Sequence, residues 1–404
     1  GIPWKTLDAL DVILAQKKNT RAIDVGITND KKYFMLLNRY YSTHERLQIK
    51  LRYLSNFRNW NLTDYIDNTS QTLLADNSGN ASFNDTITKG DARLYSILPV
   101  VKYGGTLIAD ETISAPDTLH EDMTIENGAT LFVDSTYTAK GNITVKNGGR
   151  IIGGNNGQIV FINGKQLIIE GDVQINGTAN NRLKLFYEPT TDAGIKVKRG
   201  ASLDISYCDI MESVVGISTE SNFQSIKIEN VNIVDCLGSG IVLIGPINRH
   251  SEDTPLIKNC KIMHCGFGIS AANISELVIM QDSIIDCNMG IYVSHVPAVS
   301  IVGNIINNRN TPELPGIFML SSSGNIRGNI IRGHTDGIYL AYSSPNIGGN
   351  TIEQNSEHGL FVDIGSIPNL ERGLAGALPL VIAISGYNII KDNGRDGFPP
   401  ISGD

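Results

Sequence analysis

Three polar side chains that could carry chemistry occupy the same position in three successive copies of a sequence repeat: Asp235, His264 and Asp286. If the copies stack as neighbouring β-strands, equivalent residues would lie about 4.8 Å apart. A carboxylate–imidazole–carboxylate row could hold a metal or transfer protons. The alternative is a row of solvated, paired charges, because Glu212 and Gln354 fill this position in other copies. We take the first three residues as catalytic candidates and assign no metal ligand.

A second set of residues, again one per copy, is aromatic. This aromatic stripe comprises Tyr292, Phe318, Tyr339 and Phe361, each at x in a Gly-Ile-x-Leu-like step. In a strand with Ile and Leu pointing inward, x points outward. Exposed rings could stack on sugars or form a protein interface, so these four residues are the binding or interface candidates. The alternative is that a loop, the N-terminal domain or an insertion at residues 364–381 covers the stripe.

The same strand offers little other outward chemistry. Neither the aromatic column nor the next outward column contains a cluster of carboxylates or any Lys or Arg. Glycoside hydrolysis needs a pair of carboxyl groups. This face therefore favours a non-catalytic role.

The five cysteines follow the same repeat. Cys236, Cys265 and Cys287 share one position, and Cys208 and Cys260 share another. Such positions favour small buried residues, so we expect free thiols in the core. Neighbouring strands are also close enough for a disulfide, which leaves a Cys265–Cys287 bond as the alternative. No Cys/His zinc spacing occurs.

The elements that must position these residues are short strands. The repeat has a period near 22 residues with β-branched runs and no helical pattern, which predicts a β-solenoid. About 12 or 13 rungs would fit into residues 99–404. Asn304, Asn329 and Asn350 share one position and are expected to stack with shared amide hydrogen bonds. The copies begin at Ile205, Ile228, Ile257, Ile279, Ile301, Ile326, Ile347 and Ile384.

Residues 1–98 have a different pattern. They contain both tryptophans and short alternating stretches, such as Tyr33–Asn38, between polar turns. This predicts a small β-sandwich of immunoglobulin or fibronectin type. A short helix could lie within residues 3–17. The expected fold is therefore all-β, with a β-sandwich at 1–98 followed by a right-handed parallel β-helix at 99–404.

The step from Asn-x-Ile to Gly-Ile-x-Leu resembles the right-handed parallel β-helix repeat of the pectate-lyase-like superfamily and of modular secreted bacterial proteins. The resemblance implies chemistry on outward strand positions. Lyases of this family use carboxylates that bind Ca²⁺ with an Arg or Lys base, and its hydrolases use clustered aspartates. The hydrolase motifs Asn-Thr-Asp, Gly-His-Gly and Arg-Ile-Lys are absent. Ca²⁺ is the cofactor that the resemblance would allow, and the sequence assigns none.

Composition excludes other classes of function. The 404 residues carry 33 Lys and Arg against 41 Asp and Glu, a net charge of −8, whereas nucleic-acid binders are basic. No apolar run reaches the ~18 residues of a membrane-spanning helix. The chain begins at Gly1 without a signal peptide, so we expect a processed piece.

Three functions remain open. The leading hypothesis is a secreted or cell-surface, non-catalytic scaffold, adhesin or filament subunit that associates with itself or with other surface proteins. The second is a polysaccharide lyase or glycoside hydrolase with its site elsewhere, such as Asp235, His264 and Asp286. The third is a carbohydrate-binding module that uses the aromatic stripe.

Overall fold

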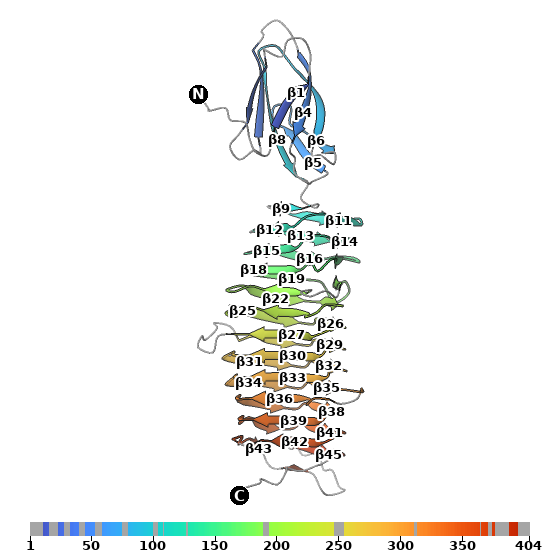
Figure 1. Cartoon of the computed structure of the whole chain (residues 1–404), viewed down its shortest axis with the longest axis vertical. Coiled ribbons are helices and arrows are strands. Elements are labelled where there is room, and N and C mark those ends of the chain that lie inside the picture. The colour runs from blue at the N-terminus through green and yellow to red at the C-terminus, as the bar shows by residue number, and fades with distance from the viewer. Residues whose placement is uncertain are drawn as a thin grey trace. The chain divides into compact units, whose positions relative to one another are not determined.

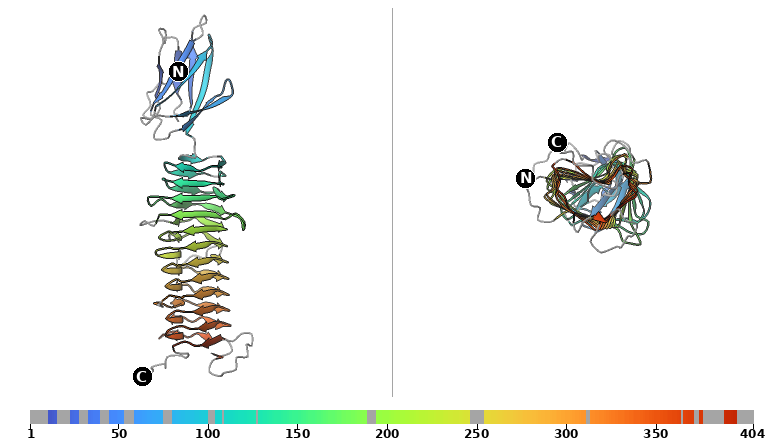
Figure 2. Two further views of the ribbon diagram at one scale, coloured as in Figure 1. Left: turned by 90° about the vertical axis from the view of Figure 1, so that its right-hand side faces the viewer. Right: turned by 90° about the horizontal axis from the view of Figure 1, so that it is seen from below.

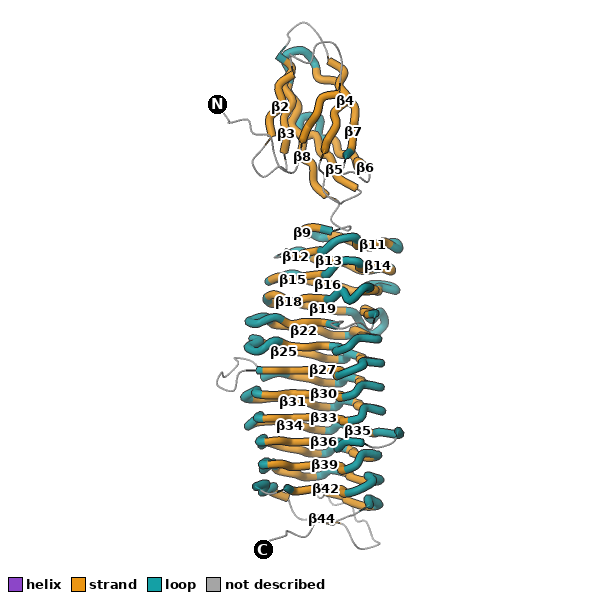
Figure 3. Tube along the Cα trace, viewed as in Figure 1, coloured by secondary structure: helices purple, strands orange, loops and turns teal. Residues whose placement is uncertain are grey.

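The computed structural model describes residues 11–15, 23–27, 33–39, 45–52, 59–74, 80–99, 104–107, 109–126, 128–188, 194–245, 254–310, 313–363, 365–370, 374–375 and 388–394. Within these ranges the regular elements are all β-strands, and there is no helix (Figure 3). The helix considered for residues 3–17 is replaced at Asp11–Ala15 by strand β1, and the rest of that range lies outside the described residues.

The chain divides into two compact units (Figure 1). The first comprises Gly1–Thr106 with Leu119–Met123, and the second comprises Leu107–Thr118 with Thr124–Asp404.

The first unit is the expected β-sandwich. A three-stranded antiparallel sheet has the order β1-β4-β7, and a five-stranded antiparallel sheet has the order β2-β3-β8-β5-β6. Both sheets contribute to one core, in which Phe34 of β3 lies 6.4 Å from Phe83 of β7 between ring centroids. The strands are β1 (Asp11–Ala15), β2 (Ile23–Ile27), β3 (Tyr33–Asn38), β4 (Glu45–Arg52), β5 (Asn59–Asp64), β6 (Thr69–Leu74), β7 (Ala81–Ile87) and β8 (Ala92–Pro99).

The second unit is a parallel β-helix with three sheets, whose strands stack along the rod (Figure 2). We name the sheets in the order in which the chain first visits them. Among the described residues the first, second and third sheets contain 12, 12 and 13 strands, close to the rung number expected from the repeat.

The strand bounds follow the repeat along each sheet. The first sheet contains β9 (Gly105–Leu107), β12 (Met123–Ile125), β15 (Ile143–Lys146), β18 (Leu167–Glu170), β21 (Ile195–Val197), β24 (Ile217–Thr219), β27 (Ser239–Ile244), β30 (Phe267–Ala272), β33 (Met289–Ser294), β36 (Ile317–Leu320), β39 (Asp336–Ala341) and β42 (His358–Val362). The second contains β10 (Glu111–Ile113), β13 (Thr130–Val133), β16 (Arg150–Gly153), β19 (Asp172–Asn176), β22 (Ser202–Ser206), β25 (Ser225–Glu229), β28 (Leu256–Lys258), β31 (Glu276–Met280), β34 (Ala298–Val302), β37 (Gly324–Arg327), β40 (Asn346–Gly348) and β43 (Asn369–Leu370). The third contains β11 (Asp117–Leu119), β14 (Thr136–Ala139), β17 (Gln158–Phe161), β20 (Leu183–Tyr187), β23 (Cys208–Met211), β26 (Asn232–Val234), β29 (Lys261–Met263), β32 (Ser283–Ile285), β35 (Ile305–Asn307), β38 (Ile330–Arg332), β41 (Thr351–Glu353), β45 (Asn388–Lys391) and β44 (Leu374–Ala375).

From β22 to β40, a single residue makes the turn from the second sheet to the third. It adopts the left-handed conformation, as Asn230 does with φ 55° and Asn259 with φ 53°, and asparagine tolerates this region better than most side chains. The next residue points into the rod. There Asn304 donates from Nδ2 to Oδ1 of Asn329 at 3.0 Å, and Asn329 donates likewise to Asn350 at 2.9 Å. The expected asparagine stacking is therefore confirmed.

Glycines shape the entry into the first sheet. A Cβ on Gly337 would lie 2.2 Å from Cγ2 of Ile352 and 2.6 Å from the carbonyl oxygen of Gly359, so only glycine fits this inward position. Ile338, the next residue, is also fully buried. Two successive inward positions interrupt the alternation of the strand, and this puts Asp336 on the outer side together with Tyr339.

All five cysteines are free and buried, as expected for core thiols. Burial raises the pKa of the Cys208 thiol to about 12, which keeps it un-ionised and unreactive near neutral pH. The Cys265–Cys287 disulfide considered above is not formed.

Candidate functional site

The aromatic stripe lies on four neighbouring strands of the first sheet, β33, β36, β39 and β42, in register. Its rings contact one another in sequence. The centroids of Tyr292 and Phe318 are 5.6 Å apart, those of Phe318 and Tyr339 4.8 Å, and those of Tyr339 and Phe361 4.6 Å. All four rings are half-buried. The structure thus brings the predicted stripe together, and its binding role stays a prediction.

Only part of the insertion expected to cover the stripe is described. Ile364, residues 371–373 and residues 376–381 lie outside the described residues. In the described part, Ile367 is 80% exposed. Gly365 sits close to Tyr342, since a Cβ on it would lie 2.8 Å from Cδ1 of that ring.

A buried acid–imidazole pair lies beside the end of the stripe. Asp336 begins β39, His358 begins β42, and the two residues are paired in register. Nδ1 of His358 is 2.7 Å from Oδ1 of Asp336, and the two residues are only 7% and 6% exposed. The imidazole also contacts the stripe, because its centroid is 5.1 Å from that of Phe361. The pair is therefore continuous with the aromatic surface.

An exposed carboxylate completes this cluster. One donor atom each from Asp336, Glu357 and His358 can be chosen so that all three lie within 4.8 Å of one another. Glu357 is exposed, whereas the other two are buried. We call these three residues the acid–histidine cluster.

The environments of the two carboxyl groups differ. Burial raises the pKa of Asp336, and the negative charge of Glu357 adds to this, while the hydrogen bond with His358 opposes it. Burial also raises the pKa of Tyr339, and the carboxylate of Asp363 contributes to that shift. A buried carboxyl that holds its proton to higher pH next to a solvated one is the arrangement that acid–base enzymes use.

The donor set of the cluster does not fit Ca²⁺. That ion takes six to eight oxygen ligands, whereas here two carboxylates stand beside an imidazole nitrogen. A mixed nitrogen and oxygen set suits a transition metal better. The Ca²⁺ that the family resemblance would allow therefore gains no support from these residues.

Sequence reasoning missed this cluster. The sequence analysis considered only the outward positions that follow the Ile of each Gly-Ile step. Asp336 and His358 instead occupy the position just before the glycine of that step. The signal was present in that column, which reads Ser239, Phe267, Met289, Pro315, Asp336 and His358 in successive rungs. Its last two members are an acid and an imidazole. The sequence prediction covered only the aromatic column and the next outward column, so this cluster lies at a position that the prediction did not consider.

The original catalytic candidates are also brought together, on turns that follow the third sheet. Nδ1 of His264 is 2.9 Å from Oδ1 of Asp235, and its Nε2 is 3.8 Å from Oδ2 of Asp286. The guanidinium of Arg309 also forms an ion pair with the carboxylate of Asp286. The backbone N–H of Arg309 donates to Oδ1 of Asp286 at 2.8 Å. This contact lowers the pKa of Asp286, so that carboxylate is neutralised by a cation and poorly suited to take up protons.

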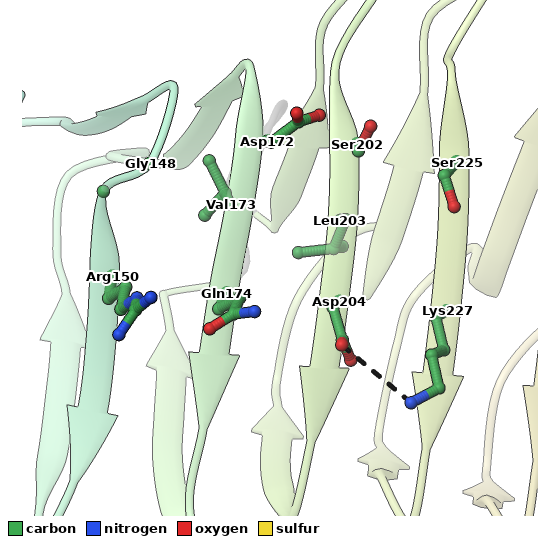
Figure 4. A pocket seen from close by; sticks show the side chains of 11 residues that line it. Gly148, Arg150, Asp172, Val173, Gln174, Ser202, Leu203, Asp204, Ser225 and Lys227 are labelled. Atoms are coloured by element: carbon green, nitrogen blue, oxygen red, sulfur yellow. Dashed lines mark ion pairs between the residues drawn. The ribbon is translucent and has the colours of Figure 1, made fainter. Parts of the chain in front are cut away.

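A polar groove of about 400 Å³ crosses the second sheet (Figure 4). Its longest row of side chains takes one residue from each of four paired strands: Arg150, Gln174, Asp204 and Lys227. Asp204 and Lys227 form an ion pair at 3.9 Å. With Asp172 the groove holds two positive and two negative side chains, nearly all exposed. Charge is balanced and solvated there, unlike in the acid–histidine cluster.

Comparison with known proteins gives the following. Residues 244–355 match the family model described as "Right handed beta helix region". No curated protein matches. Within the described residues, no helix is long and apolar enough to cross a membrane.

Solved structures with similarity include two glycoside hydrolases. The catalytic unit of the thermostable GH87 alpha-1,3-glucanase from Streptomyces thermodiastaticus strain HF3-3 is 9% identical, with a TM-score of 0.35, 91% of this chain covered and 89% of that chain. The catalytic domain of a GH87 alpha-1,3-glucanase in complex with nigerose is 10% identical, with a TM-score of 0.27, and 89% and 95% covered. The three parallel sheets and the family match over residues 244–355 show that the second unit has the right-handed parallel β-helix fold.

Proposed function

We propose that this protein binds a polysaccharide along the aromatic stripe and hydrolyses it at the acid–histidine cluster. One observation carries the proposal: the stripe and the cluster share the outer side of the first sheet and meet where His358 contacts Phe361, with centroids 5.1 Å apart. An apolar platform that ends at a buried acid is what a sugar-cleaving site requires.

The stripe supports the binding step. Four half-buried rings on consecutive rungs offer a continuous apolar track along the rod. Sugar rings pack their C–H faces against aromatic side chains, which bury apolar area and leave the hydroxyls free for hydrogen bonds. The charged groups around the end of the track are the carboxyls of Asp336, Glu357 and Asp363. The negative charge of Glu357 and Asp363 favours a neutral glycan over a uronate polymer.

The cluster supports the cleavage step. Asp336, with its raised pKa, can hold the proton that a general acid gives to the leaving oxygen. Glu357 is the solvated carboxylate, within 4.8 Å of the acid by their nearest donor atoms. Glycosidases use such a pair, with the second carboxylate acting as nucleophile when the groups are about 5–5.5 Å apart. His358 positions Asp336 through the 2.7 Å contact.

The acid–histidine cluster weakens the hypothesis of a non-catalytic scaffold, adhesin or filament subunit. That hypothesis rested on the lack of a polar cluster beside the stripe, and Asp336 and His358 now lie there. The proposal includes a secreted or cell-surface location, where the protein would meet a polysaccharide substrate.

The test is an assay of reducing-end release from α-1,3-glucan, β-glucans, xylan and polygalacturonate, with and without EDTA. We expect cleavage of a neutral glycan, unaffected by EDTA. Asp336→Asn and Glu357→Gln should each lower kcat by about 10²–10⁴, the usual contribution of a general acid or base.

The control is a variant in the row of turn residues formed by Asp235, His264 and Asp286. His264→Ala should leave kcat unchanged, because that side chain is half-exposed and lies on the turn after β29, several rungs before β39 and β42, which carry Asp336 and His358. Loss of cleavage in His264→Ala with normal rates in Asp336→Asn would transfer the site to the turn row. Absence of cleavage and of retention on every glycan would refute the proposal.

A second candidate is assembly through the same face. Tyr342 and Ile367 are 65% and 80% exposed near the end of the stripe, and apolar groups beyond a sugar platform are typical of protein interfaces. Sedimentation over a range of concentrations tests this. Oligomers that dissociate in Tyr342→Ser, without glycan cleavage by the wild type, would favour a scaffold or filament subunit.

A further inference from the structure

The asparagine ladder inside the rod has one member of a different kind. Its amides are those of Asn304, Asn329, Asn350 and Asn388, all 0–1% exposed. On the rung before Asn304, the same position holds Asp282, which is 1% exposed. A carboxyl group therefore fills an amide slot in the core.

Three of the ladder amides, those of Asn304, Asn329 and Asn350, make the same set of hydrogen bonds. Asn304, for example, donates from its backbone N–H to Oδ1 of Asn329 at 2.9 Å. Its Nδ2 donates to that same Oδ1 at 3.0 Å and to the carbonyl oxygen of Ile279, one rung back, at 3.1 Å. Asn329 and Asn350 repeat this pattern with Ile301 and Ile326. In these three amides the Nδ2 atom thus faces two acceptors.

Asp282 follows the pattern with every atom except one. Its backbone N–H donates to Oδ1 of Asn304 at 2.9 Å, and its Oδ1 accepts from the backbone N–H of Cys260 at 2.7 Å. Its Oδ2 is buried and accepts from no donor. This oxygen occupies the position that Nδ2 has in the asparagines. The two acceptors that face Nδ2 there correspond, for Asp282, to Oδ1 of Asn304 and the carbonyl oxygen of Ile257.

An ionised carboxylate would put negative charge against two acceptor oxygens in a dry site. A carboxylic acid would instead present an O–H group, which is the donor this slot needs. We propose that Asp282 carries a proton in the folded β-helix, donates it as a hydrogen bond from Oδ2, and so makes the stability of the rod depend on pH.

The electrostatics agree with this geometry. Burial raises the pKa of Asp282 to about 7, although the backbone N–H and the thiol of Cys260 and the backbone of Met280 lower it. The titratable group facing it is the Cys260 thiol on the preceding rung, whose own pKa is raised by burial. The following rung presents the neutral amide of Asn304. None of the groups that shift this pKa is a Lys, Arg or His side chain, so none of them offsets the charge of an ionised Asp282.

The sign of the pH effect follows from linkage. A carboxyl whose pKa is higher in the folded than in the unfolded state takes up a proton on folding at intermediate pH. Stability is therefore fully present below the unfolded value of 3.8 and falls as pH rises towards about 7, above which it levels off. Within this window the unfolding equilibrium constant should rise about tenfold per pH unit.

The test compares wild type with Asp282→Asn by thermal and urea unfolding from pH 3.5 to 9. The amide supplies a permanent donor, so the variant should lose this pH dependence and exceed wild type by a margin that opens between pH 4 and 7. Asp172→Asn, at an exposed position on β19, is the matched control and should follow the wild-type profile. Parallel profiles for wild type and Asp282→Asn would overturn the proposal.

Infrared spectroscopy of the folded wild type gives a second, independent readout. The difference spectrum of wild type minus Asp282→Asn should contain a carboxylic-acid C=O band at pH 6, where solvated Asp and Glu are ionised, and this band should disappear as pH rises past about 7. Any contribution from Asp336, whose pKa is also raised, is common to both proteins and cancels in the difference. A spectrum at pH 6 that is identical in wild type and variant would show Asp282 to be ionised, even if the variant were to unfold differently.

Discussion

Asp336 and His358 owe their place beside the stripe to the glycines that follow them. Gly337 and Gly359 point into the rod, where a Cβ would meet Ile352 and Ile390 at 2.2 and 2.3 Å. The strand therefore has two inward positions in a row, and the residue before each glycine emerges on the outer side. An acid placed there is buried by its neighbours yet lies next to the aromatic track, which is why its pKa is raised.

His358 should act on catalysis through Asp336, and this gives a prediction about pH. The hydrogen bond from the imidazole lowers the pKa of Asp336 against the effect of burial. Removing it in His358→Ala should raise that pKa further, so the basic limb of the kcat profile, where the acid loses its proton, should move to higher pH. A purely structural role for His358 would lower activity equally at every pH.

The ion pair on the turn row should respond to pH in the opposite direction. Arg309 lowers the pKa of Asp286, so this carboxylate stabilises the fold above its unfolded value of 3.8 and loses that effect as pH falls. Arg309→Gln should therefore lower the unfolding midpoint at pH 7 and have a smaller effect at pH 3, because the effect declines once pH falls below 3.8. An equal deficit at both values would mean that the side chain acts by packing alone.

At the scale of the element, rows of asparagine side chains connect neighbouring rungs, and these rows differ in how deeply the side chains are buried. The internal asparagine ladder is dry, whereas Asn325 and Asn346 of β37 and β40 form an outer pair, with Nδ2 of Asn346 donating to Oδ1 of Asn325 at 3.2 Å. A buried group left without a partner costs about 1–3 kcal/mol, and a solvated one costs much less. The same amide contact should therefore differ in energy with depth.

Asn329→Ala tests this difference. It removes the acceptor for Asn304 and the donor to Ile301, so we expect a loss of roughly 2–4 kcal/mol in the free energy of unfolding, from two or more buried groups left unpaired. Asn325→Ala, the matched change on the outer pair, should cost under about 1 kcal/mol. Urea unfolding measures both, and equal losses would contradict the assignment.

The elements could be predicted because their signal repeats. A period near 22 residues gave the solenoid, the stacking of Asn304 with Asn329, and the aromatic stripe, since each depends only on equivalent residues lying one above another. The acid–histidine cluster depends instead on the local break in alternation at Gly337. That break comes from contacts with Ile352 on the third sheet, which a strand read by itself does not contain.

At the scale of the whole molecule, each of the two units has its own core. The sandwich core includes Phe34, Ile49, Phe83 and Tyr95. The core of the β-helix is built rung by rung from columns of isoleucine, such as Ile257 and Ile279. A stacked array gains its stability from neighbouring rungs, whereas a sandwich unfolds as one cooperative body.

Two unfolding transitions should follow, and a substitution in each core assigns them. Phe34→Ala removes a ring that is 1% exposed and stacks on Tyr95 with centroids 4.8 Å apart, so it should cost the sandwich about 3–5 kcal/mol. It should lower the midpoint of one calorimetric transition and leave the other in place. The transition that does not move should be the one whose midpoint depends on pH through Asp282, because that carboxyl lies within the rod. If Phe34→Ala and Asp282→Asn shift the same transition, the units are coupled, and the rod draws stability from the sandwich as well as from its own ladders.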